Sequence, residues 1–227
     1  MERSRNYYNR NLEIKIINLE EIQKAKAAFR KLIKQKLAAF IFTDEKIKEA
    51  EQSASSAFLT SGFYKNASLI FCFISCKNEI STDRILVKGI LDGKQMAVPR
   101  VIPGTNKMDF YILEKLPVNS QTEPGLFGIP EPKTTLKKVN IRFLPKNAVM
   151  LMPGTAFAKD GSRIGKGKGF YDVYLEELFK KSRAFRKTGV KIGYCYDMQI
   201  AEKIPSAEHD VKVDYIISES GLIKCSQ

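Results

Sequence analysis

Residues 151–175 read LMPGTAFAKDGSRIGKGKGFYDVYL, and this stretch decides how the chain is interpreted. It begins in an apolar run, 148–152, that is typical of a buried strand, and it ends in a helix that we expect over about 170–180. Three alternating glycines, Gly165, Gly167 and Gly169, lie between the two. Glycine permits positive φ and lets backbone N–H groups approach an anion, while the helix start adds its dipole. The stretch therefore predicts a phosphate-binding loop, with charge supplied by Arg163, Lys166 and Lys168.

The loop departs from the best-known nucleotide-binding patterns. Lys166 stands where the G-x-x-x-x-G-K-[ST] pattern, counted from Gly161, requires glycine, and the G-x-G-x-x-G pattern of dinucleotide-binding proteins is absent. A glycine run after a strand is also a common structural turn. The residues alone thus favour an anion site without identifying the anion, and they weaken the alternative of a dehydrogenase.

Outward from this stretch, helix and strand patterns alternate along most of the chain. Asn18 and Glu21 resemble a capping box, and the apolar repeat after them predicts a helix over about 19–40. Further helices are expected at 44–58 and, capped by Thr82, to about Leu91. Further strands are expected at 68–74, 190–195 and 213–217, with an apolar segment at 96–98, an alternating one at 108–113 and an ordered surface loop at 117–132. This order predicts an α/β fold with a mostly parallel sheet flanked by helices on both faces, where ligands bind at the carboxyl ends of the strands.

The length of 227 residues fits one domain. Residues 1–17 are polar apart from a short apolar patch, so we assign them to an N-terminal extension and assign 18–227 to a single α/β domain. The longest apolar run, 69–76, is too short to cross a membrane, and the amino terminus lacks the apolar segment of a secretory signal. A cytoplasmic, monomeric protein is expected.

The formal net charge of +13 indicates an anionic partner. Lys and Arg residues are spread along the whole chain, from Lys24 to Lys224, so an anionic small molecule fits at least as well as nucleic acid. The four cysteines, Cys72, Cys76, Cys195 and Cys225, do not form paired C-x-x-C sets for zinc, and we expect buried reduced thiols.

Several motifs together resemble the signature of the 5-formyltetrahydrofolate cyclo-ligase family. In the opening stretch these are Met152-Pro-Gly, Phe157, Gly161, Arg163 and the run from Gly165 to Asp172. Outside it, the similar positions are Lys26-x-x-x-Arg30, Glu79, Val98-Pro-Arg100 with Met108-Asp109, Gly128-Ile-Pro-Glu-Pro132, and Glu208-His-Asp210 with Val213-Asp214. Together they cover about residues 24–218.

The resemblance implies a three-layer, doubly wound fold of the NagB/RpiA/CoA-transferase-like type and makes residues 18–227 a catalytic domain. The family uses ATP and Mg²⁺ to close 5-formyltetrahydrofolate to 5,10-methenyltetrahydrofolate, releasing ADP and phosphate. The formyl oxygen is the expected phosphoryl acceptor, because its phosphorylation makes it a better leaving group for attack by the neighbouring folate amine. For this chemistry the protein mainly has to position the substrates and neutralise the phosphate charge.

The resemblance also assigns residues to roles. ATP would be bound by Lys26, Arg30, Arg163, Ile164, Gly165, Lys166, Gly167, Lys168, Gly169, Phe170 and Tyr171. The folate would be bound by Ile74, Glu79, Phe127, Lys166, Gly167, Lys168, Gly169 and Phe170. Asp172 and Asp210 match the Mg²⁺ positions, and Lys26, Arg163 and Lys168 are the catalytic candidates.

Each assignment has a plainer alternative. Lys26 and Arg30 share a helix face and also fit a solvated basic stripe with Lys34. Asp172 suits any helix N-terminus, and Asp210 suits a turn. Phe127 and Phe170 fit core packing as well as a folate-binding wall.

Three positions depart from the family pattern: Ala158 replaces a frequent Asp, Phe127 a Trp, and Phe170 the first Tyr of a Tyr-Tyr-Asp run. Loss of the hydroxyl at Phe170 removes one hydrogen bond worth about 1 kcal/mol, which should change affinity more than the reaction class. The alternative from another class is a non-catalytic basic nucleotide- or RNA-binding protein on the same fold. The simultaneous presence of Lys26, Arg30, Glu79 and both aspartates favours the enzyme, with no nucleic acid expected as a partner. The basic charge would also suit a polyglutamylated folate.

Overall fold

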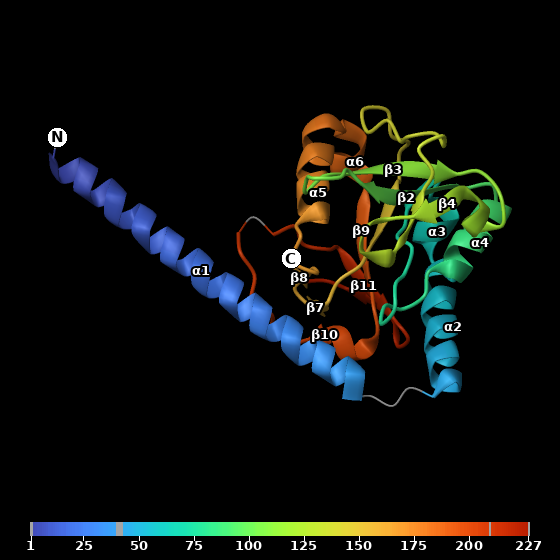
Figure 1. Ribbon diagram of the computed structural model, residues 1–227, viewed down its shortest axis with the longest axis horizontal. Helices are drawn as coiled ribbons and strands as arrows, with labels where there is room; N and C mark the ends of the chain where they lie inside the picture. Colours follow the sequence, from blue (N-terminus) through green and yellow to red (C-terminus); the bar gives the residue numbers. More distant parts are fainter. Residues whose placement is uncertain (1, 40–42, 209, 227) are drawn as a thin grey trace.

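The computed structural model describes residues 2–39, 43–208 and 210–226, apart from the side chains of 2–17 and Phe127. Its centre is a seven-stranded sheet in the order β12-β11-β9-β6-β1-β2-β3 (Figure 1). The five inner strands, from β11 to β2, are parallel, and β12 and β3 are antiparallel edge strands. The prediction of a mostly parallel sheet is confirmed. The strands are β1 (Leu69–Phe71), β2 (Gln95–Val101), β3 (Met108–Leu113), β6 (Val149–Met152), β9 (Val190–Tyr194), β11 (Tyr215–Ser218) and β12 (Gly221–Lys224).

Helices cover both faces of this sheet because its inner strands bury both of their faces. On β1, Ile70 packs into a core with Phe58 and Leu86, whereas Phe71 packs into a second core with Leu175 and Phe185. The first core is closed by α2 (Asp44–Thr60), α3 (Gly62–Asn66) and α4 (Asp83–Leu91), and the second by α5 (Phe170–Lys181) and α6 (Arg183–Thr188). The result is the expected three-layer arrangement.

Helix α1 is longer than the sequence predicted. It runs from Glu2 to Ala39, so its start at 19 and the Asn18 cap were wrong. The chain has neither glycine nor proline before Gly62, so nothing breaks the helix upstream of Asn18. Figure 1 shows the amino-terminal part of α1 projecting away from the other elements, while its second half crosses the molecule.

A small three-stranded sheet supports that second half of α1. It contains β7 (Ala156–Ala158), β8 (Arg163–Ile164) and β10 (Ile200–Ala201), in the order β10-β7-β8. Ile33 of α1 packs against Ala156 and Ile164. The contact places the helix over the glycine loop that follows β8.

Most other predicted elements appear with shifted ends, and two interpretations change. Thr82 precedes α4 but makes no capping hydrogen bond, because its hydroxyl donates to the Phe73 carbonyl at 2.6 Å. The expected loop at 117–132 contains a two-stranded sheet, β4 (Thr122–Pro124) with β5 (Pro130–Pro132), and two 3₁₀ turns, η1 (Val118–Gln121) and η2 (Leu126–Gly128); a third turn, η3 (Asp197–Gln199), precedes β10. Within the described part of the chain, no helix combines the length and the apolar character needed to cross a bilayer.

The fold brings two loops together at one edge of the sheet. Strands β1 and β6 are parallel neighbours, so the segments that leave their carboxyl ends, 72–82 and 153–169, begin side by side. This is the edge at which doubly wound proteins bind ligands.

Candidate functional site

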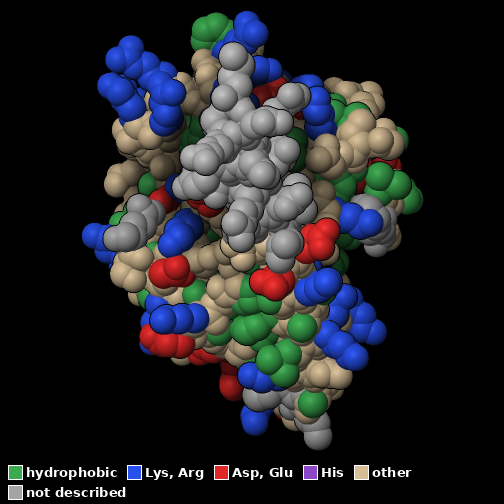
Figure 2. Space-filling model, turned by 90° about the vertical axis from the view of Figure 1, so that its left-hand side faces the viewer, with side chains coloured by type: hydrophobic (Ala, Val, Ile, Leu, Met, Phe, Trp, Pro, Cys, Tyr) green, Lys and Arg blue, Asp and Glu red, His purple; other side chains and the backbone are tan. Residues whose placement is uncertain are grey.

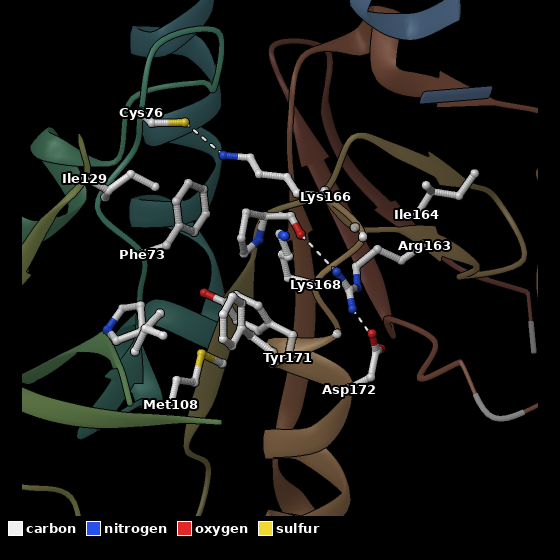
Figure 3. A pocket seen from close by; sticks show the side chains of 18 of the residues that line it. Phe73, Cys76, Met108, Ile129, Arg163, Ile164, Lys166, Lys168, Tyr171 and Asp172 are labelled. Carbon is white, nitrogen blue, oxygen red and sulfur yellow. Dashed lines mark hydrogen bonds and ion pairs between the residues drawn. The ribbon is translucent and has the colours of Figure 1, made fainter. Parts of the chain in front are cut away.

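A cavity of about 590 Å³ lies where these two loops meet α1. Its wall is built from segments far apart in the sequence: one face of α1, the loop after β1, the ends of β2 and β3, the β4–β5 region, residues 153–154 and 163–173, and Asp210. Figure 3 shows apolar side chains, among them Phe73, Ile129 and Met108, on one side and Arg163 with Asp172 on the other. The cavity therefore has an apolar and a charged compartment.

Nearly every residue that the sequence singled out lines this cavity. Those present are Lys26, Arg30, Ile74, Glu79, Arg163, Ile164, Gly165, Lys166, Gly167, Lys168, Gly169, Phe170, Tyr171, Asp172 and Asp210. The exception is Phe127, whose backbone lies in η2 and whose side chain is outside the described residues, as is all of His209. The structure thus brings together, in one place, residues that the sequence separates by more than 180 positions.

The glycine loop has the predicted positive φ at two of its three glycines, and Gly165 is the exception. Gly167 and Gly169 have φ values of 94° and 72°, in the left-handed region that favours glycine. Gly169 is the N-cap residue of α5 and, as a glycine, has no side chain with which to cap this helix end. A Cβ atom at Gly169 would meet no atom within 4 Å. The first turn of α5 therefore offers backbone N–H groups to the cavity, as an anion site requires.

Two residues of α1 fix the loop and the opposite wall. Arg30 donates from Nε to the Gly165 carbonyl oxygen at 2.8 Å. Lys26 is buried, at 4% exposure, and forms an ion pair with Asp210. Asp210 also accepts a hydrogen bond from the Ala207 backbone N–H at 2.6 Å. A solvated basic stripe is therefore the wrong interpretation of Lys26 and Arg30.

Arg163 organises the charged compartment. Its Nη2 atom lies 2.8 Å from Asp172 Oδ1, and its Nη1 donates to the Pro153 carbonyl oxygen at 3.3 Å. The guanidinium lies 5.7 Å from the centre of the Tyr171 ring, within cation–π range. Its Nε is buried without a hydrogen-bond partner among the described residues, which leaves one donor of a buried cation unused.

Lys166 bridges from the glycine loop to the loop after β1. Its Nζ lies 2.7 Å from Glu79 Oε1 and 2.8 Å from the Cys76 sulfur. Burial lowers the pKa of Lys166, but the charge of Glu79 and the hydrogen bonds to Cys76 and Glu79 outweigh it, so the pKa is raised. Burial raises the pKa of the Cys76 thiol, against the opposing hydrogen bond from Lys166. Lys166 is thus a cation, and the Cys76 thiol is protonated near neutral pH.

The apolar wall was largely missed from the sequence. Phe73, Pro99, Val101, Met108, Leu126 and Ile129 line it. Gln23, Cys76 and Glu131 are further lining residues that had no assigned role. Gln23 had a usable signal, since it lies three residues before Lys26 and seven before Arg30 on one helix face. The others come from loops and strand ends whose juxtaposition no local pattern encodes.

The prediction of buried, reduced thiols holds for three of the four cysteines. All four thiols are free, and Cys72, Cys195 and Cys225 are buried, but Cys76 is half-buried on the cavity wall. The described residues contain no cluster of three or more His, Cys, Asp or Glu side chains suited to a metal. Asp172 and Asp210 both line the cavity, and each forms an ion pair, with Arg163 and Lys26 respectively.

Comparison with known proteins identifies relatives along most of the chain. A curated mouse 5-formyltetrahydrofolate cyclo-ligase is 29% identical over 87% of this chain and 95% of its own length. A Haemophilus influenzae 5-formyltetrahydrofolate cyclo-ligase is 32% identical over 72% and 82%. The fold is shared with the NMR structure of Aquifex aeolicus 5,10-methenyltetrahydrofolate synthetase, with a TM-score of 0.70 at 23% identity over 89% of this chain and 94% of that one.

These relatives favour the enzyme over the nucleic-acid-binding alternative. The family model described as "5-formyltetrahydrofolate cyclo-ligase family" matches residues 22–219, which include every described residue of the cavity wall. By this match the chain belongs to the 5-formyltetrahydrofolate cyclo-ligase family.

Proposed function

We propose that this chain closes 5-formyltetrahydrofolate to 5,10-methenyltetrahydrofolate at the expense of ATP, releasing ADP and phosphate. The observation that carries the proposal is the single cavity in which a glycine loop, a helix N-terminus and buried cations adjoin an apolar compartment. Phosphates suit the first part and an aromatic pterin suits the second. The family membership of the chain supplies the reaction class.

ATP fits the charged compartment. Backbone N–H groups at the start of α5 and the positive φ of Gly167 and Gly169 form a concave, uncapped anion site. Arg163 and Lys168 line the same compartment, and Arg30 holds the loop through Gly165. We assign phosphate binding to residues 163–171 with Lys26 and Arg30, and charge neutralisation during transfer to Lys26, Arg163 and Lys168.

Mg²⁺ fits Asp172 and Asp210. Mg²⁺ is usually held by one or two carboxylates together with substrate phosphates and water, and both carboxylates line the phosphate side. The exposed fraction of the Asp172 side chain is 34%, so a hydrated ion can reach it. When bound, the ion would supply charge neutralisation between the phosphate oxygens.

The folate fits the apolar compartment beside Glu79. Ile74, Phe170 and the unassigned Phe73 and Met108 supply apolar wall, and Glu79 supplies a carboxylate of 10% exposure. Lys166 links the two compartments through its ion pair with Glu79. We assign the folate to Ile74, Glu79, Phe127, residues 166–169 and Phe170.

The proposed chemistry needs little covalent participation from the protein. The formyl oxygen bonds to the γ-phosphorus as the bond to ADP breaks; the folate amine then bonds to the formyl carbon, losing its proton to water, as the carbon–oxygen bond breaks and phosphate leaves. The chain's contribution is to hold both substrates in line and to oppose the phosphate charge.

The test is formation of the methenyl product from 5-formyltetrahydrofolate, ATP and Mg²⁺, followed by its near-ultraviolet absorbance. We expect product only when the folate, ATP and Mg²⁺ are all present. We also expect Lys26→Ala to lower kcat/KM at least ~100-fold, a loss of about 3 kcal/mol of transition-state stabilisation. Absence of product from folded natural protein would overturn the proposal.

Further assignments extend this proposal. We propose that residues 18–227 form the catalytic domain and that residues 1–17 are an extension. We also propose that the protein is a monomer in the cytoplasm without nucleic-acid or membrane partners.

A polyglutamate tail on the folate would suit the net charge of +13. Comparison of KM for mono- and polyglutamylated substrate at two salt concentrations tests that point, since equal KM values would contradict it.

A further inference from the structure

Two tyrosines one helical turn apart on α5 bury hydroxyl groups that have no hydrogen-bond partner among the described residues. They are Tyr171 and Tyr174. Leaving such a group unsatisfied costs about 1–3 kcal/mol, and native structures retain few of them. The two differ in one respect: Tyr171 lines the cavity, whereas Tyr174 packs in the core with Phe110 and Phe71.

The Tyr171 ring is held from two sides. The Arg163 guanidinium lies 5.7 Å from the ring centre, and the Phe110 ring lies edge-on at 6.4 Å. Figure 3 shows the hydroxyl pointing toward the side of Phe73, Ile129 and Met108, away from Arg163 and Asp172. The unused polar group therefore faces the apolar compartment and not the phosphate side.

The hydroxyl is available as a hydrogen-bond donor. Burial, followed by the nearby Cys72 and Glu79, raises its pKa well above the ordinary value for tyrosine, so it stays protonated. Phe170, the preceding residue, carries no hydroxyl, and Tyr171 is the one tyrosine among the described residues of the cavity wall. The hydroxyl oxygen is covered by surrounding protein atoms, so a ligand acceptor in the apolar compartment meets it once a neighbouring side chain moves aside.

We infer that the Tyr171 hydroxyl donates a hydrogen bond to a carbonyl oxygen of the bound folate, making Tyr171 a substrate-binding residue through its side chain. The inference rests on the proposed function. By this inference Tyr171 contacts both substrates. Its backbone N–H, in the first turn of α5, lies on the phosphate side, and its side chain contacts the folate. The folate would supply an acceptor for a hydroxyl that has none among the described residues.

The test compares Tyr171→Phe with Tyr174→Phe as the matched control. Each variant removes one buried, unpartnered oxygen and keeps the ring. Neither variant should lose thermal stability, because a group that costs free energy in the fold is removed. Tyr171→Phe should raise KM for 5-formyltetrahydrofolate about tenfold with KM for ATP unchanged, as expected for loss of one hydrogen bond to substrate. Tyr174→Phe should leave both KM values unchanged.

Calorimetry with 5-formyltetrahydrofolate and with 5-methyltetrahydrofolate, which lacks the formyl oxygen, shows whether the hydrogen bond goes to the formyl oxygen or to a carbonyl oxygen that both ligands carry. Weaker binding of both ligands by Tyr171→Phe assigns the hydrogen bond to a carbonyl that both ligands share, such as that of the pterin; weaker binding of the formyl compound alone assigns it to the formyl oxygen. Unchanged binding of both, or a loss confined to ATP, overturns the inference. An inactive natural protein would defeat the proposed reaction, whereas an active natural protein with an unchanged Tyr171→Phe variant would defeat the inference alone.

Discussion

At the scale of single residues, the cavity keeps its charges in pairs. Lys26 pairs with Asp210, Arg163 with Asp172 and Lys166 with Glu79. A buried charge without a partner is costly, so loss of one member of a pair would leave the other uncompensated. Two of the pairs join a proposed phosphate-binding cation to a proposed Mg²⁺ ligand. Binding of ATP with Mg²⁺ would let each partner exchange, the cation toward phosphate and the carboxylate toward the metal.

This exchange predicts that the metal controls nucleotide affinity through Asp172 and Asp210. Calorimetric titration of the natural protein should show ATP binding at least ~10-fold more tightly with Mg²⁺ than with EDTA, because without metal the two carboxylates repel the phosphates. Asp172→Asn should shrink this ratio toward one. Glu202→Gln, which alters an ion pair with Lys159 outside the cavity, is the control and should keep the full ratio. A metal effect that survives in Asp172→Asn would remove this residue from the metal site.

Cys76 offers a second residue-scale prediction, because it is the half-buried thiol among three buried ones. Burial raises its pKa above the ordinary value of 9.0, and the hydrogen bond from Lys166 opposes that rise. Alkylation by iodoacetamide proceeds through the thiolate, so it should be slow at pH 7.5 and should accelerate only above about pH 9.

Lys166→Met should move this alkylation profile to higher pH, since the group that lowers the pKa is lost while Glu79 remains. ATP with folate should protect the thiol, because Cys76 lines the cavity. Mass spectrometry of the labelled peptide measures both effects, and Cys76→Ser is the control that should abolish labelling. Fast labelling at pH 7.5, or a profile unmoved by Lys166→Met, would contradict this account.

The residue-scale predictions from sequence were good where a motif names the residue and poor elsewhere. Lys26, Arg163 and Asp172 were found because the spacing of their motifs is specific. Phe73 and Leu126 were not, because each becomes a wall residue only through the packing of separate strands and loops. Burial of Lys26 was also hidden from the sequence, since its partner Asp210 is 184 residues away.

At the scale of elements, the strand–loop–helix unit from β6 to α5 carries the proposed nucleotide site. Its glycines are needed for different reasons. Gly161 has a φ of +84°, and a Cβ there would lie 2.4 Å from the Val213 carbonyl oxygen. Gly169 has a φ of +72° and open space around the same position. The first glycine is therefore needed for packing, and the second for the shape of the anion site.

Alanine substitutions should separate these two roles. Gly161→Ala should destabilise the fold by roughly 3 kcal/mol, lowering Tm by roughly 6–12 °C, because backbone must move to admit the methyl group. Gly169→Ala should cost only ~1 kcal/mol of backbone strain, about 2–4 °C, while its methyl group in the anion site should raise KM for ATP about tenfold. Scanning calorimetry and steady-state kinetics measure the two effects; equal Tm losses, or an unchanged KM for ATP in Gly169→Ala, would contradict the division.

Elements with strong periodicity were predicted well. β3 lies at 108–113 as the alternation indicated, and α5 begins at Phe170 as expected. The two- and three-residue strands β7, β8 and β10 were missed because alternation cannot be recognised over so few residues. The β4–β5 pair was missed because its prolines are typical of a loop. Both strands lie outside the main sheet, in a two-stranded sheet that tolerates proline.

At the scale of the whole molecule, the excess positive charge is not a property of the cavity. Its described wall carries five cationic side chains, Lys26, Arg30, Arg163, Lys166 and Lys168, against four carboxylates, Glu79, Glu131, Asp172 and Asp210. Most of the net +13 therefore lies elsewhere. Figure 2 shows Lys and Arg scattered over one face with Asp and Glu among them, and not gathered into a single stripe. Such a surface favours general attraction of anionic substrates over a defined nucleic-acid groove.

The projecting part of α1 gives the last prediction. The cavity-lining residues of this helix begin at Gln23, and the side chain that anchors it to β7 and β8 is Ile33, so removal of residues 1–17 should spare both the site and its support. In the shortened chain, Asn18 would stand at the new helix start three residues before Glu21, where the pair can act as a capping box. We expect kcat and both KM values within about twofold of the full chain, since every described α1 residue of the cavity wall is retained. Removal of residues 1–30 is the contrasting variant: it takes away Lys26 and Arg30 and should lose at least ~100-fold in kcat/KM. If the shorter deletion already abolishes activity while the protein remains folded by circular dichroism, residues 1–17 belong to the catalytic unit and the proposed domain boundary is wrong.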